Sequence, residues 1–457
     1  MERIVDIVND IVWSPALVAI LIFAGLYLTI RTRCVQVRRL GLMARLLFAP
    51  KSNSGTKGIS SFQAFCVALA GRVGTGNIVG VATAIALGGP GAVFWMWVTA
   101  FFGASTAFTE STLAQLYRFP HHTGWRGGPA CYIEKGLGQR WLGVIFAVLT
   151  IIGYGLLLTT VQTNGVTSAF ANAFHFSPLA TGIAIVVLLG LVIIGGLTRI
   201  SRVASVVTPF MAAAYIIFAL IIIGFHWQAV PGVFKAIFAG AFGADPLFGG
   251  IVGSTISMGV KRGLFSNEAG EGGGAIVSAS ADVDHPAKQG LVQAFSVYVD
   301  TFFVCTATAL MILCTGTYNV FGADGTPIIS GAPELGSNYV GFTQSAIDSV
   351  FGGFGSAFVA IALAFFSFTT LMAYYFYAES SIFYLFDGKD KKKETAVIWI
   401  YRLCMFGCVI FGALNQAGVV WKVGDIGVGI TTWVNVIVLL LLCPQALKAL
   451  RELESQK

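Results

Sequence analysis

Two short stretches combine charged and amide side chains with several glycines inside otherwise apolar sequence. GRVGTGN occupies residues 71–77, and RGLFSNEAG occupies residues 262–270. Glycine accepts backbone angles that other residues resist, so a helix unwinds readily at such a point. Unwinding exposes carbonyl groups at the end of the upstream half and amide groups at the start of the downstream half. The carbonyl end favours cations and the amide end favours anions.

The sequence around these stretches is that of a membrane protein. Hydrophobic residues make up 56% of the 457 residues and charged residues 11%, and the mean hydropathy is +0.80. Soluble domains carry roughly 25% charged residues. Because about 20 apolar residues span a bilayer as a helix, we predict an all-α integral membrane protein with eleven transmembrane helices, at residues 12–30, 62–88, 91–117, 140–174, 179–197, 203–225, 249–283, 287–316, 350–386, 395–414 and 419–443.

The basic residues predict the orientation of these spans. Alternate loops hold most of the Lys and Arg, including the run KDKKK at 389–393, whereas the other set of loops holds only Arg3 and Lys235. The positive-inside rule therefore places the N-terminus outside and the C-terminus in the cytoplasm, in the inner (plasma) membrane of the cell. The net charge of +7 follows from this topology, so we expect the lipid bilayer as a partner and no nucleic acid.

Basic and apolar residues also alternate at helical spacing in VQVRRLGLMARLLFAP, residues 35–50. This pattern suits a helix that lies on the inner membrane surface. The alternative is a solvated connector.

The two glycine-rich stretches fall in the second and seventh predicted spans. A helix interrupted at membrane depth is tolerated only beside protein or a watery cavity. An offset of five spans makes the two helices run in opposite directions, which is the arrangement of a 5+5 inverted repeat with a midplane site at broken helices 2 and 7. We expect one transporter domain over residues 1–457, with an extra helix at 12–30, repeat one at 62–225, repeat two at 249–443 and a cytoplasmic tail at 444–457.

Two other interpretations of the glycines were considered. Glycines in membrane helices also serve as close-packing points, although the matched pair favours a site. A nucleotide-binding loop is disfavoured because no strand precedes GTGNIVG and no GKS or GKT occurs.

Ionisable residues within or beside the spans point to the same region. Such groups are costly in a membrane and usually pair with one another or line a pathway. Glu268 and Glu271 beside the second break are candidates for gate partners of Arg72 or for a proton site. The alternative is internal ion pairs that join helices. The full set is Arg72, Glu110, Lys261, Arg262, Glu268, Glu271, Asp300, Glu379 and Asp425.

No enzyme and no cofactor is expected. The eight cysteines contain no CxxC, so no redox or zinc site is implied, and the five histidines form no HExxH. No GxSxG occurs either. The His121–His122 pair is predicted to lie on the surface of a loop. A channel would need a continuous polar ring, which the paired breaks suit less well than an occluded site.

Three segments resemble the alanine/glycine:cation symporter family (sodium:alanine symporter type), which belongs to the five-plus-five inverted-repeat amino-acid transporter superfamily. They are GTGNIVGVATAIALGGPGAVFWMW (74–97), RGLFSNEAG (262–270) and HPAKQGLVQAFSVYVDT (285–301). The resemblance runs from about residue 10 to residue 445. It implies eleven spans and uptake of a small neutral amino acid with Na⁺, or in some members with H⁺.

The resemblance also implies the substrate residues. The backbone amides of the first break would hold the substrate carboxylate, and the other residues would line the pocket. The implied substrate-binding residues are Thr75, Gly76, Asn77, Gln162, Asn164, Phe265, Ser266, Asn267, Thr370 and Tyr374. Gln162 and Asn164 could instead only join helices by hydrogen bonds.

The sodium site is implied in the same way. Na⁺ would be held by the carbonyls of Gly71 and Gly74, the side-chain oxygen of Asn77, and the hydroxyls of Thr369 and Thr370. Hard cations take oxygen ligands. The alternative for the two threonines is a bond back to their own helix.

Two departures from the family pattern bear on the substrate. Glu271, Gly272 and Gly273 stand where many members have Met-Gly-Ser, and Tyr374 stands where many have Trp. These departures indicate alanine less strongly than the family itself, and they add a substrate with a longer polar side chain, such as glutamine, whose amide the Tyr374 hydroxyl could bond. The alternative for Tyr374 is core packing. An H⁺-coupled amino-acid carrier remains the first alternative to Na⁺ coupling, and an ion channel the second.

Overall fold

The structure is a computed structural model, and it describes the chain except residues 1, 52–57, 245–247, 323, 387–389 and 457. Lys389 of the basic run and Lys457 of the predicted tail thus lie outside the described residues. Nearly all secondary structure is helical. The first half of the chain forms α1 (Glu2–Val12), α2 (Pro15–Arg31), α3 (Val35–Arg38), α4 (Leu40–Leu46), α5 (Ser61–Arg72), η1 (Gly76–Gly80), α6 (Val81–Gly88), α7 (Ala92–Leu116), β1 (Phe119–His121), β2 (Gly124–Arg126), α8 (Pro129–Leu137), α9 (Arg140–Ile152), η2 (Gly153–Leu157), α10 (Leu158–Phe174), α11 (Pro178–Ile193) and α12 (Gly196–Phe225).

The second half forms the same kinds of element, with a second short hairpin. Its elements are η3 (Trp227–Ala229), α13 (Val230–Ala241), η4 (Gly249–Ile251), α14 (Val252–Asn267), α15 (Gly273–Ala279), α16 (Pro286–Tyr298), η5 (Val299–Cys305), α17 (Thr306–Thr315), β3 (Asn319–Phe321), β4 (Pro327–Ser330), η6 (Pro333–Leu335), α18 (Tyr339–Phe351), α19 (Phe354–Phe386), α20 (Lys391–Leu414) and α21 (Ala417–Ser455).

The first predicted interruption, at residues 71–77, coincides with a real break. A capping box starts α5: the Ser60 hydroxyl accepts a hydrogen bond from the Gln63 amide, and the Gln63 side chain accepts one from the Ser60 amide. The helix ends at Arg72, and Val73 is already extended. The chain resumes at Gly76 as a short π-helix that leads into α6, and the two halves meet at an angle of 51°.

The second break lies later than expected. The stretch RGLFSNEAG at 262–270 predicts an interruption from its start, but α14 continues to Asn267 and the chain leaves the helix only at Glu268. A single glycine such as Gly263 is tolerated within a helix, whereas Glu268, Gly270 and Gly272 adopt positive φ angles of 52°, 96° and 98°. The left-handed backbone ends α14, and α15 begins at Gly273.

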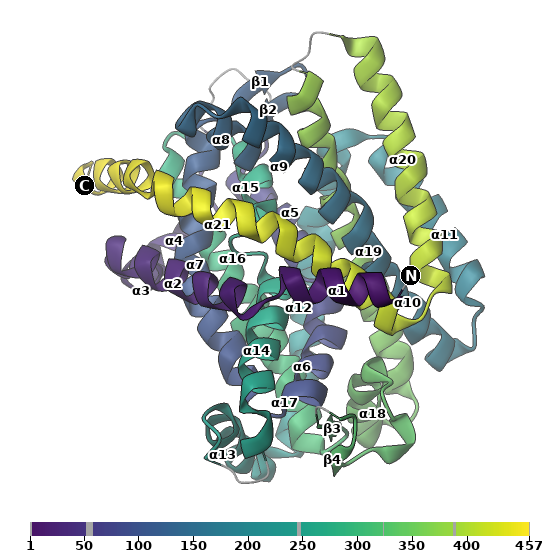
Figure 1. The fold of residues 1–457 in the computed structure, drawn as a ribbon. Coiled ribbons are helices and arrows are strands. Elements are labelled where there is room, and N and C mark those ends of the chain that lie inside the picture. The colour runs from purple at the N-terminus through teal and green to yellow at the C-terminus, as the bar shows by residue number, and fades with distance from the viewer. Residues whose placement is uncertain (1, 52–57, 245–247, 323, 387–389, 457) are drawn as a thin grey trace.

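The two broken spans run in opposite directions. The half before the first break, α5, packs against α15, the half after the second break, and α14 packs against α6. In Figure 1 α5 and α15 lie in the upper half of the molecule and α6 and α14 in the lower half. This is the antiparallel relation that the offset of five spans predicts.

The predicted spans agree closely in position with the helices. The number of helices that could each cross a membrane can be compared with the eleven predicted spans. Among the described residues, eight helices are long and apolar enough to cross a membrane, and α5 with α6 adds a ninth as one bent span. The prediction of eleven also counts α11, a shorter apolar helix, and the broken pair α14 and α15. The predicted surface helix at 35–50 forms two short helices, α3 and α4, while α13 and α18 occupy segments that were predicted to be loops.

Candidate functional site

Side chains from two helices, α10 and α19, converge on the unwound residues of the first break. Gly74 lies between Gln162 of α10 and Thr370 of α19, because a Cβ on Gly74 would lie 2.6 Å from the Gln162 Oε1 and 2.6 Å from the Thr370 Oγ1. The Thr75 amide donates a hydrogen bond to Gln162 Oε1 at 2.9 Å. A free amide at the start of a helix half is thus satisfied by a side-chain oxygen, which is the place a carboxylate oxygen would take.

Thr370 sits at the carbonyl end of α5. Its hydroxyl lies 2.7 Å from the Ala70 carbonyl oxygen, 3.2 Å from that of Val73 and 3.0 Å from that of Phe366 in its own helix. The expected carbonyls were those of Gly71 and Gly74, so the oxygens that surround the Thr370 hydroxyl come from residues one position earlier. These four oxygens are the donor type that a hard cation such as Na⁺ takes.

Two of the implied residues, Thr369 and Asn164, form their hydrogen bonds with groups other than the unwound residues of the first break. The Thr369 hydroxyl donates to the Phe366 carbonyl at 2.9 Å, within its own helix. The Asn164 side chain donates to the carbonyls of Gly412 and Asn415, at 3.0 and 2.9 Å. Asn164 therefore joins α10 to the end of α20, which matches the alternative interpretation of that residue.

Asn77 connects the first break to the second broken span through Asp300. Its side-chain oxygen accepts from the Gly74 amide at 2.8 Å, and its side-chain nitrogen donates to Asp300 Oδ1 at 2.6 Å. The Ser266 hydroxyl donates to the same carboxylate at 3.0 and 3.1 Å. The Asn77 oxygen, expected to face an ion or substrate, is occupied by the backbone in this conformation.

Aromatic rings close the sides of this region. A Cβ on Gly76 would lie 3.0 Å from the Phe265 ring, and that ring packs on Trp421 with centroids 5.0 Å apart. On the other side Tyr374 meets Tyr154 edge-on at 5.3 Å. Tyr154 was missed in the sequence, because an aromatic residue in an apolar span carries no signal of its own.

Arg72 ties the end of α5 to the end of α14. Its guanidinium donates to the Asn267 carbonyl at 2.6 Å, to Gln293 Oε1 at 2.9 Å and to the Ser296 hydroxyl. The Asn267 side-chain oxygen accepts from the Ala269 amide at 3.0 Å. The predicted pairing of Arg72 with Glu268 or Glu271 is not among the ion pairs of the described residues.

The two glutamates at the second break are instead held by tyrosines. The Tyr154 hydroxyl donates to Glu271 at 2.9 Å, and the Tyr377 hydroxyl donates to Glu268 at 3.2 Å. The second oxygen of each carboxylate, Oε1, is buried and has no hydrogen-bond partner in the described chain. An ionised carboxylate is costly to bury unless it is paired and hydrogen-bonded.

The site is closed to water from both sides in this conformation. The core residues of the cluster are fully buried, namely Thr75, Asn77, Ser266, Asn267, Thr369 and Thr370, each at 0% exposure. Beyond the cluster, the chain before α5 pairs with the chain after α15: the Ile59 amide donates to the Ser280 carbonyl, and the Asp282 amide donates to the Ile59 carbonyl. The halves α5 and α15 are thus fastened together at their outer ends.

Comparisons with known proteins agree with this architecture. The whole chain, residues 1–457, matches the model of the Sodium:alanine symporter family. A putative sodium/proton-dependent alanine carrier protein of Bacillus subtilis is 50% identical over 100% of this chain and 93% of its own length. A probable sodium/glutamine symporter of the same organism is 41% identical over 100% and 91%. A sodium/alanine symporter of Methanococcus maripaludis is 37% identical over 96% and 94%.

Solved structures show the same fold at low sequence identity. The crystal structure of MhsT in complex with L-phenylalanine superposes with a TM-score of 0.60 at 14% identity, covering 84% of this chain and 89% of that one. A manganese transporter of Eremococcus coleocola superposes with a TM-score of 0.59 at 15% identity, covering 86% and 81%. The predicted fold class, an all-helical membrane transporter with two broken helices, is confirmed.

Proposed function

Because the chain belongs to the sodium:alanine symporter family, we propose that it takes up a small neutral amino acid together with Na⁺ by alternating access. The observation that carries this proposal is the Thr370 hydroxyl, which lies at 2.7 and 3.2 Å from carbonyl oxygens at the end of α5. Na⁺ bound among these oxygens would fix the angle between the broken span and α19. Cation binding would thereby shape the amide end that receives the substrate.

The substrate carboxylate is proposed to bind at Thr75 and Gly76. The Thr75 amide already donates to an uncharged side-chain oxygen, that of Gln162. A charged carboxylate accepts a hydrogen bond about twice as strong as a neutral acceptor does, so substrate would displace the Gln162 oxygen. The remaining proposed pocket residues are Asn77, Phe265, Ser266, Asn267, Thr370 and Tyr374, with Asn164 as a supporting joint between helices.

Membrane potential supplies a driving force for this reaction. An amino acid near pH 7 is a zwitterion, so its transfer moves no net charge. Each cotransported cation gains about 2.3 kcal/mol per 100 mV, which corresponds to roughly fifty-fold accumulation of substrate. The proposed uptake is therefore electrogenic.

The substrate class is tested most directly by uptake into proteoliposomes. The panel consists of labelled alanine, glycine and glutamine, each with and without an inward Na⁺ gradient. We expect at least one of the three to accumulate only with the gradient. Accumulation of none of them, or equal accumulation without Na⁺, would contradict the proposal.

A proton-coupled carrier is the second candidate function. The surroundings of the Glu271 carboxylate favour it. This carboxylate is 1% exposed, bonds to one tyrosine hydroxyl and leaves its other oxygen unsatisfied within the described residues. Burial of an ionised carboxylate without a cation is costly, so Glu271 would carry a proton in this closed state. A pH gradient that drives uptake in the wild type but not in Glu271→Gln, with no Na⁺ present, would establish this alternative.

The topology completes the proposal. We propose eleven spans in the inner membrane, with the N-terminus outside and the C-terminus cytoplasmic, an extra first helix, and two inverted repeats over 62–225 and 249–443. The positive-inside pattern supports the orientation. An ion channel is the third candidate; single-channel currents in a planar bilayer would favour it over a carrier.

A further inference from the structure

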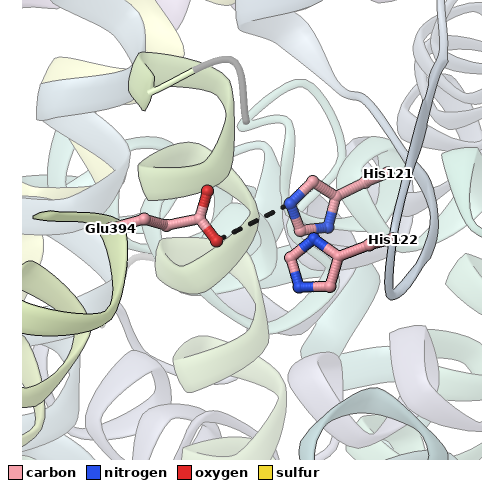
Figure 2. A group of neighbouring side chains, drawn as sticks. All are labelled: His121, His122 and Glu394. Carbon is pink, nitrogen blue, oxygen red and sulfur yellow. Dashed lines mark ion pairs between the residues drawn. The ribbon is translucent and has the colours of Figure 1, made fainter. Parts of the chain in front are cut away.

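A second cluster of polar side chains lies outside the broken spans, between the β1–β2 hairpin and the first turn of α20. His121 and His122 come from the hairpin and Glu394 from α20, and one ligand atom of each lies within 4.8 Å of the others. The Nε2 atom of His121 lies 3.7 Å from Glu394 Oε1. Figure 2 shows the two imidazole rings side by side, with the carboxylate facing them across the gap.

Two members of this cluster, His121 and Glu394, each have a buried polar atom that makes no hydrogen bond within the described part of the chain. The side chains of His121 and Glu394 are 4% and 5% exposed. His121 Nε2 and Glu394 Oε2 have no hydrogen-bond partner among the residues that the structure describes. A buried polar atom without a partner is destabilising, and more so when it is charged. A gap of 3.7 Å is too long for a hydrogen bond, so the ring and the carboxylate do not satisfy each other.

The other ring nitrogen of His121 is already engaged. Its Nδ1 lies 2.8 Å from the Thr123 hydroxyl, and when it carries no proton it accepts a longer hydrogen bond, of 3.4 Å, from the Thr123 amide. In the tautomer in which Nδ1–H donates to the nearer hydroxyl, the lone pair of Nε2 points into the gap. Histidines that bind metals are typically held this way by a hydrogen bond from their second nitrogen.

We propose that His121, His122 and Glu394 form a binding site for Zn²⁺. Two imidazoles and one carboxylate are a ligand set that Zn²⁺ accepts, with a fourth position left for water. His122 is exposed, so that position opens to solvent and the exposed ring is free to close the remaining distance. The cation Arg126 lies near His121 and Glu394, but its guanidinium pairs with Glu379 at 3.4 Å and lies over the rings of Phe376 and Phe383.

Metal at this site would connect the hairpin to α20. The hairpin is already fixed to the end of α15: the Ser280 hydroxyl donates to the Trp125 carbonyl at 2.9 Å, and Arg118 donates to the Ala281 carbonyl at 2.5 Å. Ile59, before α5, pairs with the same end of α15. Bound Zn²⁺ would therefore hold the outer ends of α5 and α15 against α20 in the closed arrangement, and would slow any cycle that opens them.

Zn²⁺ binding is measured on the full-length protein in lipid nanodiscs, after removal of any affinity tag and of bound metal with a chelator. Isothermal titration with Zn²⁺ should give one site per chain. His122→Ala and Glu394→Gln should weaken it by about tenfold or more, since even second-sphere changes cost 10–100-fold. His175→Ala, which removes an exposed histidine elsewhere, is the matched control and should bind as the wild type does.

His122 is exposed, so its substitution tests the site without risk to folding. Co²⁺ in place of Zn²⁺ should give the visible absorption of a tetrahedral complex in the wild type and not in His122→Ala. Saturable Zn²⁺ binding that is equal in the wild type, His122→Ala and Glu394→Gln would overturn the site and assign the metal to other groups, such as the exposed thiol of Cys34. Lack of saturable binding to the wild type would overturn it as well.

The effect on the transport cycle rests on the proposed function, whereas the binding site does not. In proteoliposomes, Zn²⁺ on the side that carries the hairpin should slow Na⁺-driven uptake several-fold in the wild type and leave His122→Ala unaffected. Equal inhibition of both proteins, or Zn²⁺ binding without inhibition, would overturn the coupling to the cycle. Absence of uptake in metal-free wild type would instead contradict the proposed transport, and the titration would still decide the site.

Discussion

Thr370 and Thr369 are adjacent on α19 but have different surroundings. The Thr370 hydroxyl reaches across to the carbonyls of Ala70 and Val73, whereas the Thr369 hydroxyl bonds only to its own helix in the described chain. The family resemblance implies both threonines as sodium ligands, and the sequence alone does not distinguish two neighbouring hydroxyls. Their different bonding makes them a matched pair for testing which hydroxyl the cation needs.

Replacement of Thr370 by valine should weaken Na⁺ coupling selectively. Valine keeps the shape of threonine and removes the oxygen, and a hydrogen bond or ligand contact to a charged group is worth about 1.5–3 kcal/mol. The Na⁺ concentration for half-maximal uptake in proteoliposomes should therefore rise about tenfold or more. Thr369→Val should change it by much less. Equal shifts in the two variants would contradict the assignment of Thr370 to the cation.

The structure also identifies the partners of Asp425. Its carboxylate receives two hydrogen bonds from Arg262 at 2.8 and 2.9 Å and one ion pair from Lys261 at 2.8 Å, with Arg262 and Asp425 both buried. This matches the alternative interpretation of these ionisable residues as internal pairs that join helices, here α14 and α21.

Asp425→Asn should destabilise the protein strongly. Removal of one partner from a buried ion pair costs about 3–5 kcal/mol because the other charge stays buried. Asp6→Asn removes an exposed ion pair with Lys422 and should cost about 1 kcal/mol or less. The midpoint of thermal unfolding in detergent compares the two. A loss in Asp425→Asn no larger than that in Asp6→Asn would show that the buried pair contributes little.

At the scale of elements, the positions of the breaks were only partly predictable. The glycines and polar residues of GRVGTGN mark the first break correctly, since α5 ends at Arg72 and the chain resumes at Gly76. Thr370 contacts the carbonyl of Ala70 in the last turn of α5 and that of Val73 just after the helix, whereas the carbonyls of Gly71 and Gly74 were expected. Composition does not fix how far a helix turns before it unwinds, so the sequence could not assign these carbonyls. The second break lies at residues 268–272, after the first glycine of the stretch, Gly263. The helix ends where the backbone turns left-handed at Glu268, and glycine content alone does not predict that point.

Long-range partners were the least predictable part of the site. Tyr154 and Tyr377 bond to the two glutamates from other helices, and an apolar span gives no sign of which aromatic residue faces inward. His121 shows the same limit. The pair His121–His122 was predicted to lie on a loop surface, which is right for His122 and wrong for His121, whose side chain is buried against Phe383 and α20.

Gly74→Ala should abolish most uptake while Gly80→Ala should not. A Cβ at position 74 would lie 2.6 Å from both Gln162 Oε1 and Thr370 Oγ1, so the unwound segment must move away from them. A Cβ at position 80 meets nothing closer than 3.7 Å. Overpacking costs about 1–3 kcal/mol, and at position 74 it falls on the proposed ion and substrate groups. Na⁺-driven uptake at equal protein amounts measures the difference; normal uptake by Gly74→Ala would contradict this geometry.

At the scale of the whole molecule, the antiparallel packing of α5 with α15 and of α14 with α6 unites the two breaks into one site. Each half-helix faces its counterpart from the other broken span, so movement of one pair past the rest of the bundle would open one end of the site while closing the other. The backbone hydrogen bonds of Ile59 with Ser280 and Asp282 would then belong to one of the two gates that we propose. By the predicted orientation this gate faces the cytoplasm.

The orientation of the chain in the membrane can be tested directly with reporter proteins fused to its C-terminus. Because the positive-inside rule places the end of α21 in the cytoplasm, a green fluorescent protein fused there should fluoresce in bacterial cells, and alkaline phosphatase fused at the same point should be inactive. The reverse pattern, an active phosphatase and a dark fluorescent protein, would show the opposite orientation.

The central claim is that one site, built from two broken spans, binds the amino acid and Na⁺ interdependently. Equilibrium binding of the best labelled substrate to purified protein, measured over a series of Na⁺ concentrations, tests it most directly. Coupling free energies of about 1–3 kcal/mol correspond to 5–150-fold changes in affinity, so wild-type affinity should rise at least about fivefold with Na⁺, and Thr370→Val should lose that rise. Substrate affinity that is the same at every Na⁺ concentration in the wild type would contradict the claim.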